Sequence, residues 1–278
     1  MKTINEIEII NAVEKLCLDA NFSLSKKVLK KIATSEDTES SPIGKKILGQ
    51  IIENASIAES EFKPMCQDTG IVVVFLEIGK VQFNFDIHEA VNEGVRRAYK
   101  TGYLRKSIVK HPLDRENTKD NTPAIIHTKI TNTDNLKITI APKGGGSENM
   151  SKLKMLTPAE GYQGVKDFII NTIKEAGGKT CPPIIVGVGI GGNLEKAALI
   201  SKEALMRDIE DSSPDEINKK LEDELLEEIN NLGVGPMGFG GNTTALAVKV
   251  NTYPCHIAAL PVAVNLQCHA ARHKSVIL

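Results

Sequence analysis

Hydrophobic residues recur at helical spacing through the first sixty residues. One stripe returns every three or four residues from Ile4 to Leu16, and a second begins at Val28. The polar stretch "TSEDTESSPIG" interrupts the pattern, and a third helix is expected from about Ile43 to Ser60. The chain is therefore predicted to begin with a helical region, residues 1–60.

The pattern changes after residue 70, where apolar and β-branched residues run together. "IVVVFLEI" and "VQFNF" are predicted to be the two strands of a hairpin that turns at Gly79 and Lys80. A helix should follow, because Asp86 is a suitable N-cap and Gly102 a suitable terminator. The polar segment 103–126 is longer than most connections, and such loops are often functional.

Strands and helices alternate in the rest of the chain. Strands are expected at about 124–130 and 136–141, in "PPIIVGVGIGG", in "TALAVKV" and in "HIAALPVAV"; helices are expected at 158–176, after Gly192 and at 214–232. Their interleaving indicates a mixed α/β fold, with no strand order specified. The prediction is one domain, residues 1–278, in which the helical region 1–60 precedes an α/β region, residues 61–278.

Composition and charge narrow the function classes. The chain has 278 residues, of which 41% are hydrophobic and 25% charged, the balance of an ordinary globular protein. Its net charge of −1 supplies no basic field for nucleic acid or an anionic membrane. No stretch reaches the ~18 apolar residues of a spanning helix, and the start lacks a signal peptide's apolar core. A cytoplasmic protein is expected.

The cysteines do not form a familiar short motif. The chain has five cysteines, an odd number, and its sequence shows no export signal, which argues against a disulfide framework. No two of the cysteines form a CxxC pair, which argues against a zinc knuckle. Cys17 lies on the apolar stripe of a helix and should be a core residue. Cys66, Cys181 and Cys268 stand at breaks between elements, although buried structural cysteines are the simplest interpretation from the residues alone. Cys255 is ambiguous.

Two glycine-rich segments have competing interpretations. The GxGxGG run at 187–192 suggests dinucleotide binding, but no acidic residue ends a strand about 20 residues later, so a closely packed turn is favoured. "KGGGSEN" could form an anion-binding nest around Gly145 or a flexible hairpin end. Arg105 could bind a carboxylate or be an ordinary surface cation. His256 could be a core residue or a catalytic one.

Several segments together resemble a known family, the iron–sulfur-dependent class I fumarases, and within it the two-subunit fumarate or L(+)-tartrate dehydratases. The resemblance extends from about residue 63 to residue 273, with the motifs in the same order. The segments are "MCQDTG", "LRKS", "DNTPAIIH", "PKGGGSENMSKLKMLTPAEG", "CPPIIVGVGIGG", "GPMGFGGNTTALAVKV" and "PCHIAALPVAVNLQCHAARH".

The resemblance implies a [4Fe-4S] cluster held by Cys66, Cys181 and Cys268, with one iron open to act as a Lewis acid. It also implies that Gln67, Asp68, Arg105 and the backbone at Gly145 bind a small dicarboxylate. By the same resemblance, Asp68 and His256 form a candidate proton relay to the hydroxyl group that leaves or adds.

The resemblance further implies a partner protein. One-chain family members continue into a second domain with a catalytic threonine base, whereas this chain ends at Leu278. It therefore looks like an α subunit, inactive without a separate β subunit, in an α2β2-type hydro-lyase. Fumarate hydration is favoured over L(+)-tartrate dehydration because central metabolism makes it commoner, and a non-catalytic binding or scaffold subunit is the alternative from another class.

Overall fold

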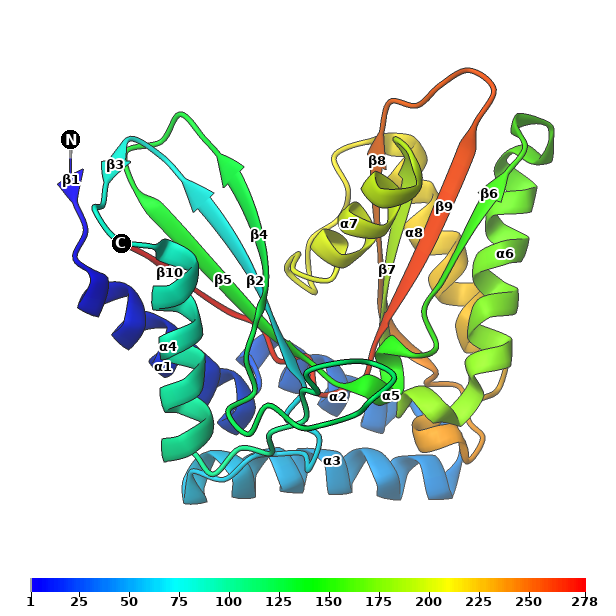
Figure 1. The fold of residues 1–278 in the computed structure, drawn as a ribbon. Helices are drawn as coiled ribbons and strands as arrows, with labels where there is room; N and C mark the ends of the chain where they lie inside the picture. The colour runs from blue at the N-terminus through cyan, green and yellow to red at the C-terminus, as the bar shows by residue number, and fades with distance from the viewer. Residues whose placement is uncertain (1) are drawn as a thin grey trace. The chain divides into compact units, whose positions relative to one another are not determined.

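The computed structural model describes residues 2–278, which form two compact units (Figure 1). Unit 1 takes in the chain up to Leu24, together with Asn54–Gly145 and Arg272–Leu278. Unit 2 comprises Ser25–Glu53 and Gly146–Ala271. The chain therefore passes between the units after residues 24, 53, 145 and 271, so that each unit is assembled from separate stretches of sequence.

The main helices are α1 (Glu6–Phe22), α2 (Lys26–Thr38), α3 (Pro42–Glu61), α4 (Ile87–Thr101), α5 (Gly145–Glu148), α6 (Gly161–Ala176), α7 (Leu194–Ala204) and α8 (Glu216–Asn230). The short 3-10 helices are η1 (Pro158–Glu160), η2 (Gly177–Thr180) and η3 (Pro236–Gly238). The strands are β1 (Lys2–Thr3), β2 (Ile71–Ile78), β3 (Val81–Gln82), β4 (Ile125–Ile130), β5 (Leu136–Lys143), β6 (Lys152–Leu156), β7 (Ile184–Gly191), β8 (Ala245–Tyr253), β9 (Leu260–Gln267) and β10 (Lys274–Ile277). The mixed α/β class predicted from the sequence is confirmed. None of the described helices combines the length and apolar character needed to cross a membrane.

Unit 1 is built on a four-stranded sheet in the order β10-β5-β2-β4. The even-numbered residues of β2, from Val72 to Ile78, face a core shared with α1 and α4. Asp86 caps α4 as predicted, because its carboxylate accepts hydrogen bonds from the backbone N–H groups of His88 and Glu89. The apolar period of the sequence therefore determined which face of each element is buried in this unit.

The hairpin predicted at 71–85 is wrong. β2 pairs with β5 antiparallel and with β4 parallel, whereas β3 pairs with β1. A side chain at Gly79 would collide with Thr133 and Asn135, which come from the connection between β4 and β5. Strands from a distant part of the sequence thus occupy both edges of β2, so the adjacent segment must turn away.

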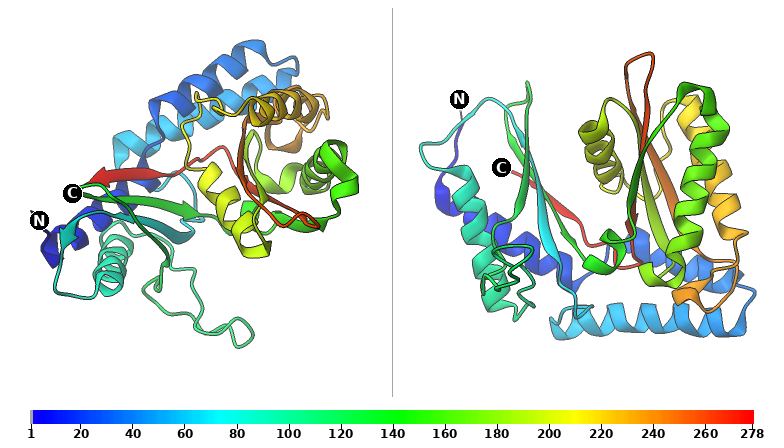
Figure 2. Two further views of the ribbon diagram at one scale, coloured as in Figure 1. Left: turned by 90° about the horizontal axis from the view of Figure 1, so that it is seen from above. Right: turned by 45° about the vertical axis from the view of Figure 1, so that its right-hand side comes forward.

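Unit 2 is built on a second four-stranded sheet in the order β6-β9-β7-β8. Helices α6 and α8 cover one face of this sheet and α7 covers the other (Figure 2, right). β7 runs parallel to β8, with Ile184 opposite Ala245, and antiparallel to β9, with Ile185 opposite Gln267. The beginnings of β7 and β8 therefore lie at the same end of the sheet as the end of β9.

The glycines of the GxGxGG run belong mainly to strand β7. A Cβ atom at Gly187 would come within 2.2 Å of the Ser201 carbonyl oxygen, and one at Gly189 within 2.1 Å of the Ala197 carbonyl oxygen. Since both contacts are with α7, the glycines let this helix lie directly against the strand. The interpretation as a closely packed segment is supported, although most of it is strand and not turn.

Candidate functional site

The segment Cys66–Asp68 forms an ordered turn between α3 and β2 in unit 1. Cys66 and Asp68 are half-buried, whereas Gln67 is exposed. The two carboxylate oxygens of Asp68 accept hydrogen bonds from two backbone N–H groups, Oδ1 from Gly70 at 3.0 Å and Oδ2 from Gly145 at 2.8 Å. The acid is thus fixed in orientation, two residues after the cysteine.

Buried polar side chains stabilise this turn through hydrogen bonds to its backbone carbonyl oxygens. Tyr99 donates its hydroxyl to the carbonyls of Thr69 and Gly70, and Asn121 donates to Gly70 as well. Burial raises the pKa of Tyr99, so this hydroxyl stays protonated and remains a donor. Arg272, 3% exposed, donates from Nη1 to the Asp68 carbonyl oxygen at 2.7 Å. The backbone around the candidate acid is therefore held by groups that cannot easily move.

The long polar segment that follows α4 brings Arg105 to the same turn. The Thr69 hydroxyl donates to the Arg105 carbonyl oxygen at 2.9 Å, while the Arg105 side chain is exposed. Asn121 links the two ends of this polar segment, because its Oδ1 accepts a hydrogen bond from the Ser107 N–H at 2.7 Å. In unit 1 the structure thus brings together Cys66, Gln67, Asp68, the Arg105 backbone and Gly145.

In unit 2, Cys181 and Cys268 meet at one end of the sheet. Cys181 follows η2 in a left-handed conformation, with φ 54°, and leads into β7, whereas Cys268 directly follows β9. The N–H of His269 donates to the Cys181 carbonyl oxygen at 3.4 Å, which joins the two cysteine segments. The Gln267 side-chain amide lies 3.4 Å from the sulfur of Cys268 and can donate to it. Two of the three predicted ligands therefore share one location.

His256 lies at the other end of the same sheet. It follows β8 and precedes β9, beyond the pair formed by Gly191 and Tyr253, whereas the cysteines stand beside Ile185 and Gln267. The eight residues of β7 separate these ends by about 25 Å at the usual rise of a strand. Within unit 2 the structure does not bring His256 to the two cysteines.

The other two cysteines differ in their surroundings. Cys17 is fully buried in the unit 1 core, where burial, and then the charge of Glu14, raise the pKa of its thiol. Its prediction as a core residue is confirmed. Cys255 is exposed beside His256 and donates to the Ala259 carbonyl oxygen at 3.3 Å.

A buried acid that the sequence did not suggest, Glu39, supports the Cys181 turn. Its carboxylate accepts from the backbone N–H groups of Asn242 at 2.9 Å and Thr243 at 2.8 Å. The loop that carries them includes Met237, whose N–H donates to the Pro182 carbonyl oxygen at 2.8 Å. Glu39 thus holds one end of residues 235–243, and the other end packs against the residue after Cys181.

Glu39→Ala is expected to destabilise unit 2 by about 3 kcal/mol, because buried N–H groups would lose their acceptor. Burial raises the pKa of Glu39, but the N–H groups of Ser41, Asn242 and Thr243 outweigh it and lower the pKa below its ordinary value of 4.5. The stabilisation is therefore complete above about pH 4.5 and lost as pH falls through the lowered pKa. Denaturant unfolding at neutral and acidic pH measures both effects.

Glu175→Ala removes an exposed acid of the same unit and is the control. Equal free energies of unfolding for the Glu39 and Glu175 variants at neutral pH would contradict the role given to Glu39.

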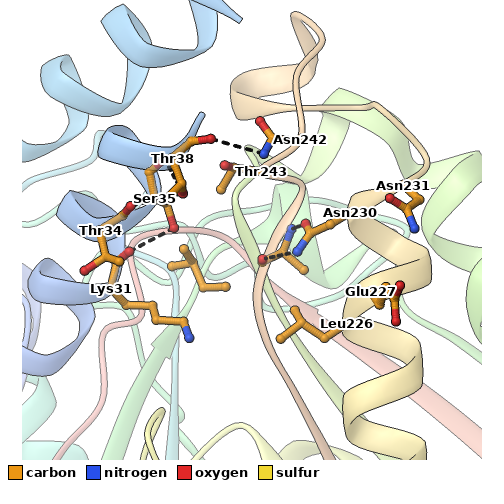
Figure 3. Close-up of a pocket in the computed structure, with 12 residues that line it drawn as sticks. Lys31, Thr34, Ser35, Thr38, Leu226, Glu227, Asn230, Asn231, Asn242 and Thr243 are labelled. Atoms are coloured by element: carbon orange, nitrogen blue, oxygen red, sulfur yellow. Dashed lines mark hydrogen bonds between the residues drawn. The ribbon is translucent and has the colours of Figure 1, made fainter. Parts of the chain in front are cut away.

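A pocket of about 370 Å³ lies in unit 2 between α2 and α8 (Figure 3). Its wall includes Thr38 and Asn242, which are joined by a hydrogen bond of 3.3 Å, and Asn230, whose Oδ1 accepts from the N–H groups of Thr244 and Ala245. None of the predicted site residues lines this pocket. It is therefore distinct from the candidate site.

The donor chemistry of the three cysteines suits an iron–sulfur cluster, because thiolates are the preferred ligands of such clusters. Cys66, Cys181 and Cys268 are each half-buried at a turn. The Nε–H of Arg272, buried near Asp68, has no hydrogen-bond partner among residues 2–278 and can serve an added acceptor. Among residues 2–278, no group of three His, Cys, Asp or Glu side chains lies close enough together to hold a metal ion. Of the three predicted cysteine ligands, Cys66 belongs to unit 1, whereas Cys181 and Cys268 belong to unit 2.

Three buried residues that support the predicted site segments within their own units were missed from the sequence: Tyr99 and Arg272 in unit 1, and Glu39 in unit 2. Glu39 lies in a polar stretch with no local sign of burial, and Tyr99 appears as one more residue of an amphipathic helix. Arg272 carried a usable signal, because it lies in "CHAARH", four residues after a predicted ligand.

The structure is thus a mixed α/β protein with half-buried cysteines near strand ends and an acid of fixed orientation beside one of them. The family comparison is more specific. The model of the fumarate hydratase (Fumerase) family matches residues 10–277, and the chain belongs to this family of hydro-lyases.

Two curated relatives are similar over nearly their whole length. The chain is 44% identical over 276 residues to a protein of Methanocaldococcus jannaschii named putative L(+)-tartrate dehydratase subunit alpha, covering 96% of each chain. It is 30% identical over 287 residues to the L(+)-tartrate dehydratase subunit alpha of Escherichia coli K12, covering all of this chain and 94% of the relative.

Proposed function

We propose that this chain is the cluster-bearing α subunit of a hydro-lyase that interconverts fumarate and (S)-malate, completed by a separate β subunit in an α2β2-type complex. Family membership supports the reaction class, and the relatives' names support the subunit type. The observation that carries the proposal is the turn at Cys66, where the following acid is already oriented by the N–H groups of Gly70 and Gly145. A carboxylate held in a fixed orientation beside the first proposed ligand supports an enzyme subunit over a non-catalytic scaffold subunit.

The proposed ligands of the [4Fe-4S] cluster are Cys66, Cys181 and Cys268. When bound, the cluster would supply an open iron as a Lewis acid for the substrate hydroxyl and one carboxylate. The amide of Gln267, 3.4 Å from the sulfur of Cys268, would donate to the thiolate and stabilise its negative charge.

The chain's own residues would bind and orient the dicarboxylate. The exposed guanidinium of Arg105 suits a carboxylate, since its paired N–H groups match two oxygens. The amide of Gln67 offers a donor and an acceptor next to the first cysteine. The N–H of Gly145 is used by Asp68 in this structure, so a substrate carboxylate at that position would replace Asp68 Oδ2.

In the dehydration direction, the C2 hydroxyl leaves with a proton as water and a C3 proton is removed as the double bond forms. Asp68 and His256 are proposed to supply the proton to the leaving hydroxyl. The base that removes the C3 proton is proposed to belong to the β subunit. The α chain alone should therefore have no hydro-lyase activity.

The deciding experiment reconstitutes the α and β chains anaerobically and measures kcat/KM for (S)-malate and for L(+)-tartrate. We expect malate to be preferred. L(+)-tartrate dehydration is the second candidate, favoured by the names of both relatives. A higher kcat/KM for tartrate would replace the first proposal with the second, and activity of the α chain alone would contradict the two-chain site.

Oxygen sensitivity gives a separate prediction. An iron with an open coordination position is accessible to oxidants, so activity of the complex should fall by about tenfold or more in air and return with ferrous iron and thiol. Parallel incubations with and without oxygen, followed by activity and iron analysis, measure this. Equal half-lives in the two incubations would count against the open iron.

A further inference from the structure

The turn that carries the first proposed ligand, residues 65–68, is held at both of its ends by hydrogen bonds within unit 1. At its start, the Met65 N–H donates to the Asn21 carbonyl oxygen at 3.0 Å. At its end, the Asp68 carbonyl oxygen accepts from Arg272 Nη1 at 2.7 Å. We call residues 65–68 the cysteine turn. Because the ligand lies between these two bonds, its separation from the acid depends on Asn21 and Arg272.

Asn21 and Arg272 also bind each other and helix α1. Arg272 Nη1 donates to Asn21 Oδ1 at 3.1 Å, and the Asn21 side-chain amide donates to the Cys17 carbonyl oxygen at 2.9 Å. Both side chains are buried, and α1 packs in the core of unit 1. The Asn21–Arg272 pair is therefore anchored to a packed helix, and it cannot shift without disturbing that helix.

The positive charge of Arg272 is unfavourable to bury, and an apolar side chain would pack in its place at a lower cost in free energy. The guanidinium lies near the acid as well as near its backbone. A Cβ atom added at Gly144 would lie 3.1 Å from Asp68 Oδ2 and 3.4 Å from Arg272 Nη2. Gly144 thus leaves room for both groups. A cation in this position attracts the carboxylate while its Nη1 group holds the carbonyl of the same residue.

We propose that Arg272, held by Asn21, is a positioning residue for the hydro-lyase reaction and fixes the separation between the Cys66 sulfur and the Asp68 carboxylate. The inference rests on the proposed function, in which Cys66 is a cluster ligand and Asp68 takes part in proton transfer. A displacement of about 1 Å between reacting groups can lower a rate about a hundredfold. Arg272 therefore affects the reaction through the geometry of the cysteine turn.

Arg272→Met in the reconstituted two-chain complex tests this role. The three proposed cysteine ligands remain, so iron per chain should equal that of the wild type. We expect kcat per iron-loaded complex to fall about 100-fold while KM changes by less than about threefold, because the groups that react are displaced whereas those that bind the substrate remain. A merely structural residue would reduce the amount of loaded complex and leave its kcat unchanged, and that result would overturn the proposal.

Two further variants test the need for the charge at this position. Arg272→Lys keeps the charge and a donor, so its kcat should be about tenfold or more above that of Arg272→Met. Lys274→Met is the matched control, because Lys274 Nζ donates to Ser23 Oγ at 3.3 Å and so binds the residue that follows α1 without a hydrogen bond to the cysteine turn. Its kcat and KM should equal those of the wild type. Equal kcat values for Arg272→Lys and Arg272→Met, or for Lys274→Met and Arg272→Met, would overturn the proposal.

Hydrogen exchange of the full α chain, without cluster or β subunit, gives a readout that does not depend on activity. The backbone amides of residues 65–70 should exchange about tenfold faster in Arg272→Met than in the wild type, because the cysteine turn opens more often. Equal exchange rates would overturn the proposal.

If Arg272→Met does not fold, Asn21→Ala takes its place. It removes the second acceptor of Arg272 Nη1 and leaves the guanidinium, so kcat per loaded complex should fall about tenfold with unchanged iron content. A wild-type kcat in this variant would overturn the proposal. A wild-type complex that dehydrates neither malate nor tartrate would instead overturn the proposed function, and the exchange rates would still decide whether the Asn21–Arg272 pair holds the turn.

Discussion

Cys66→Ser, Cys181→Ser and Cys268→Ser are each expected to abolish hydro-lyase activity of the two-chain complex. Loss of the proposed Lewis acid would remove several kcal/mol of transition-state stabilisation, and about 4 kcal/mol corresponds to a thousandfold lower kcat. Serine is close in size to cysteine but is a poor ligand for iron in a cluster. Activity, visible absorbance and iron per chain should therefore fall together.

Cys17→Ala is the matched control for these three variants. Cys17 is fully buried in the unit 1 core and contributes packing only, so its loss should cost about 1 kcal/mol of stability and leave the iron content unchanged. A serine variant of one of the three proposed ligands that retained both iron and activity would remove that cysteine from the ligand set.

Gly189→Ala is expected to prevent unit 2 from folding correctly or to destabilise it by about 3 kcal/mol or more, because overpacking against a backbone cannot be relieved by a rotamer change. The added Cβ would lie 2.1 Å from the Ala197 carbonyl oxygen and 2.7 Å from the Ser201 backbone nitrogen. Helix α7 would have to move away from β7. Thermal or denaturant unfolding measures the change.

Gly233→Ala distinguishes this effect from the general cost of replacing a glycine. Gly233 has φ +70°, but a Cβ atom added there would meet no other atom within 4 Å, so only the backbone strain of about 1 kcal/mol applies. If the Gly189 and Gly233 variants were equally stable, the glycines of β7 would not be needed for helix packing.

The packing of Gly187 and Gly189 argues against the dinucleotide-binding interpretation, which the sequence already disfavoured. A phosphate-binding loop needs its glycines between the strand and the helix, where backbone N–H groups are exposed. Here Gly187 and Gly189 lie within β7, and their bare faces are covered by α7. The spacing of the glycines was visible in the sequence, but their structural role, to allow close packing of a helix on the strand, depended on the tertiary structure.

Local patterns predicted most of the elements themselves. Helices α3 and α8 begin and end within a few residues of the predicted limits, and Asp86 and Gly102 bound α4 as expected. The strands β6 and β10 were not predicted; they are five and four residues long, and together they contain three lysines and one serine. Short polar strands at the edge of a sheet carry little periodic signal, because much of their surface is exposed.

The sequence by itself determined the fold class, the helices and longer strands, and the order of motifs that leads to the family. Only the tertiary structure decided that β2 lies between β4 and β5, that Glu39 is buried under the Cys181 turn, and that His256 and Cys268 stand at opposite ends of one sheet. The physical reason is the distance along the chain over which each kind of interaction acts. Periodicity and capping depend on residues a few positions apart, whereas strand pairing and buried polar contacts can join residues more than two hundred positions apart, such as Glu39 and Thr243.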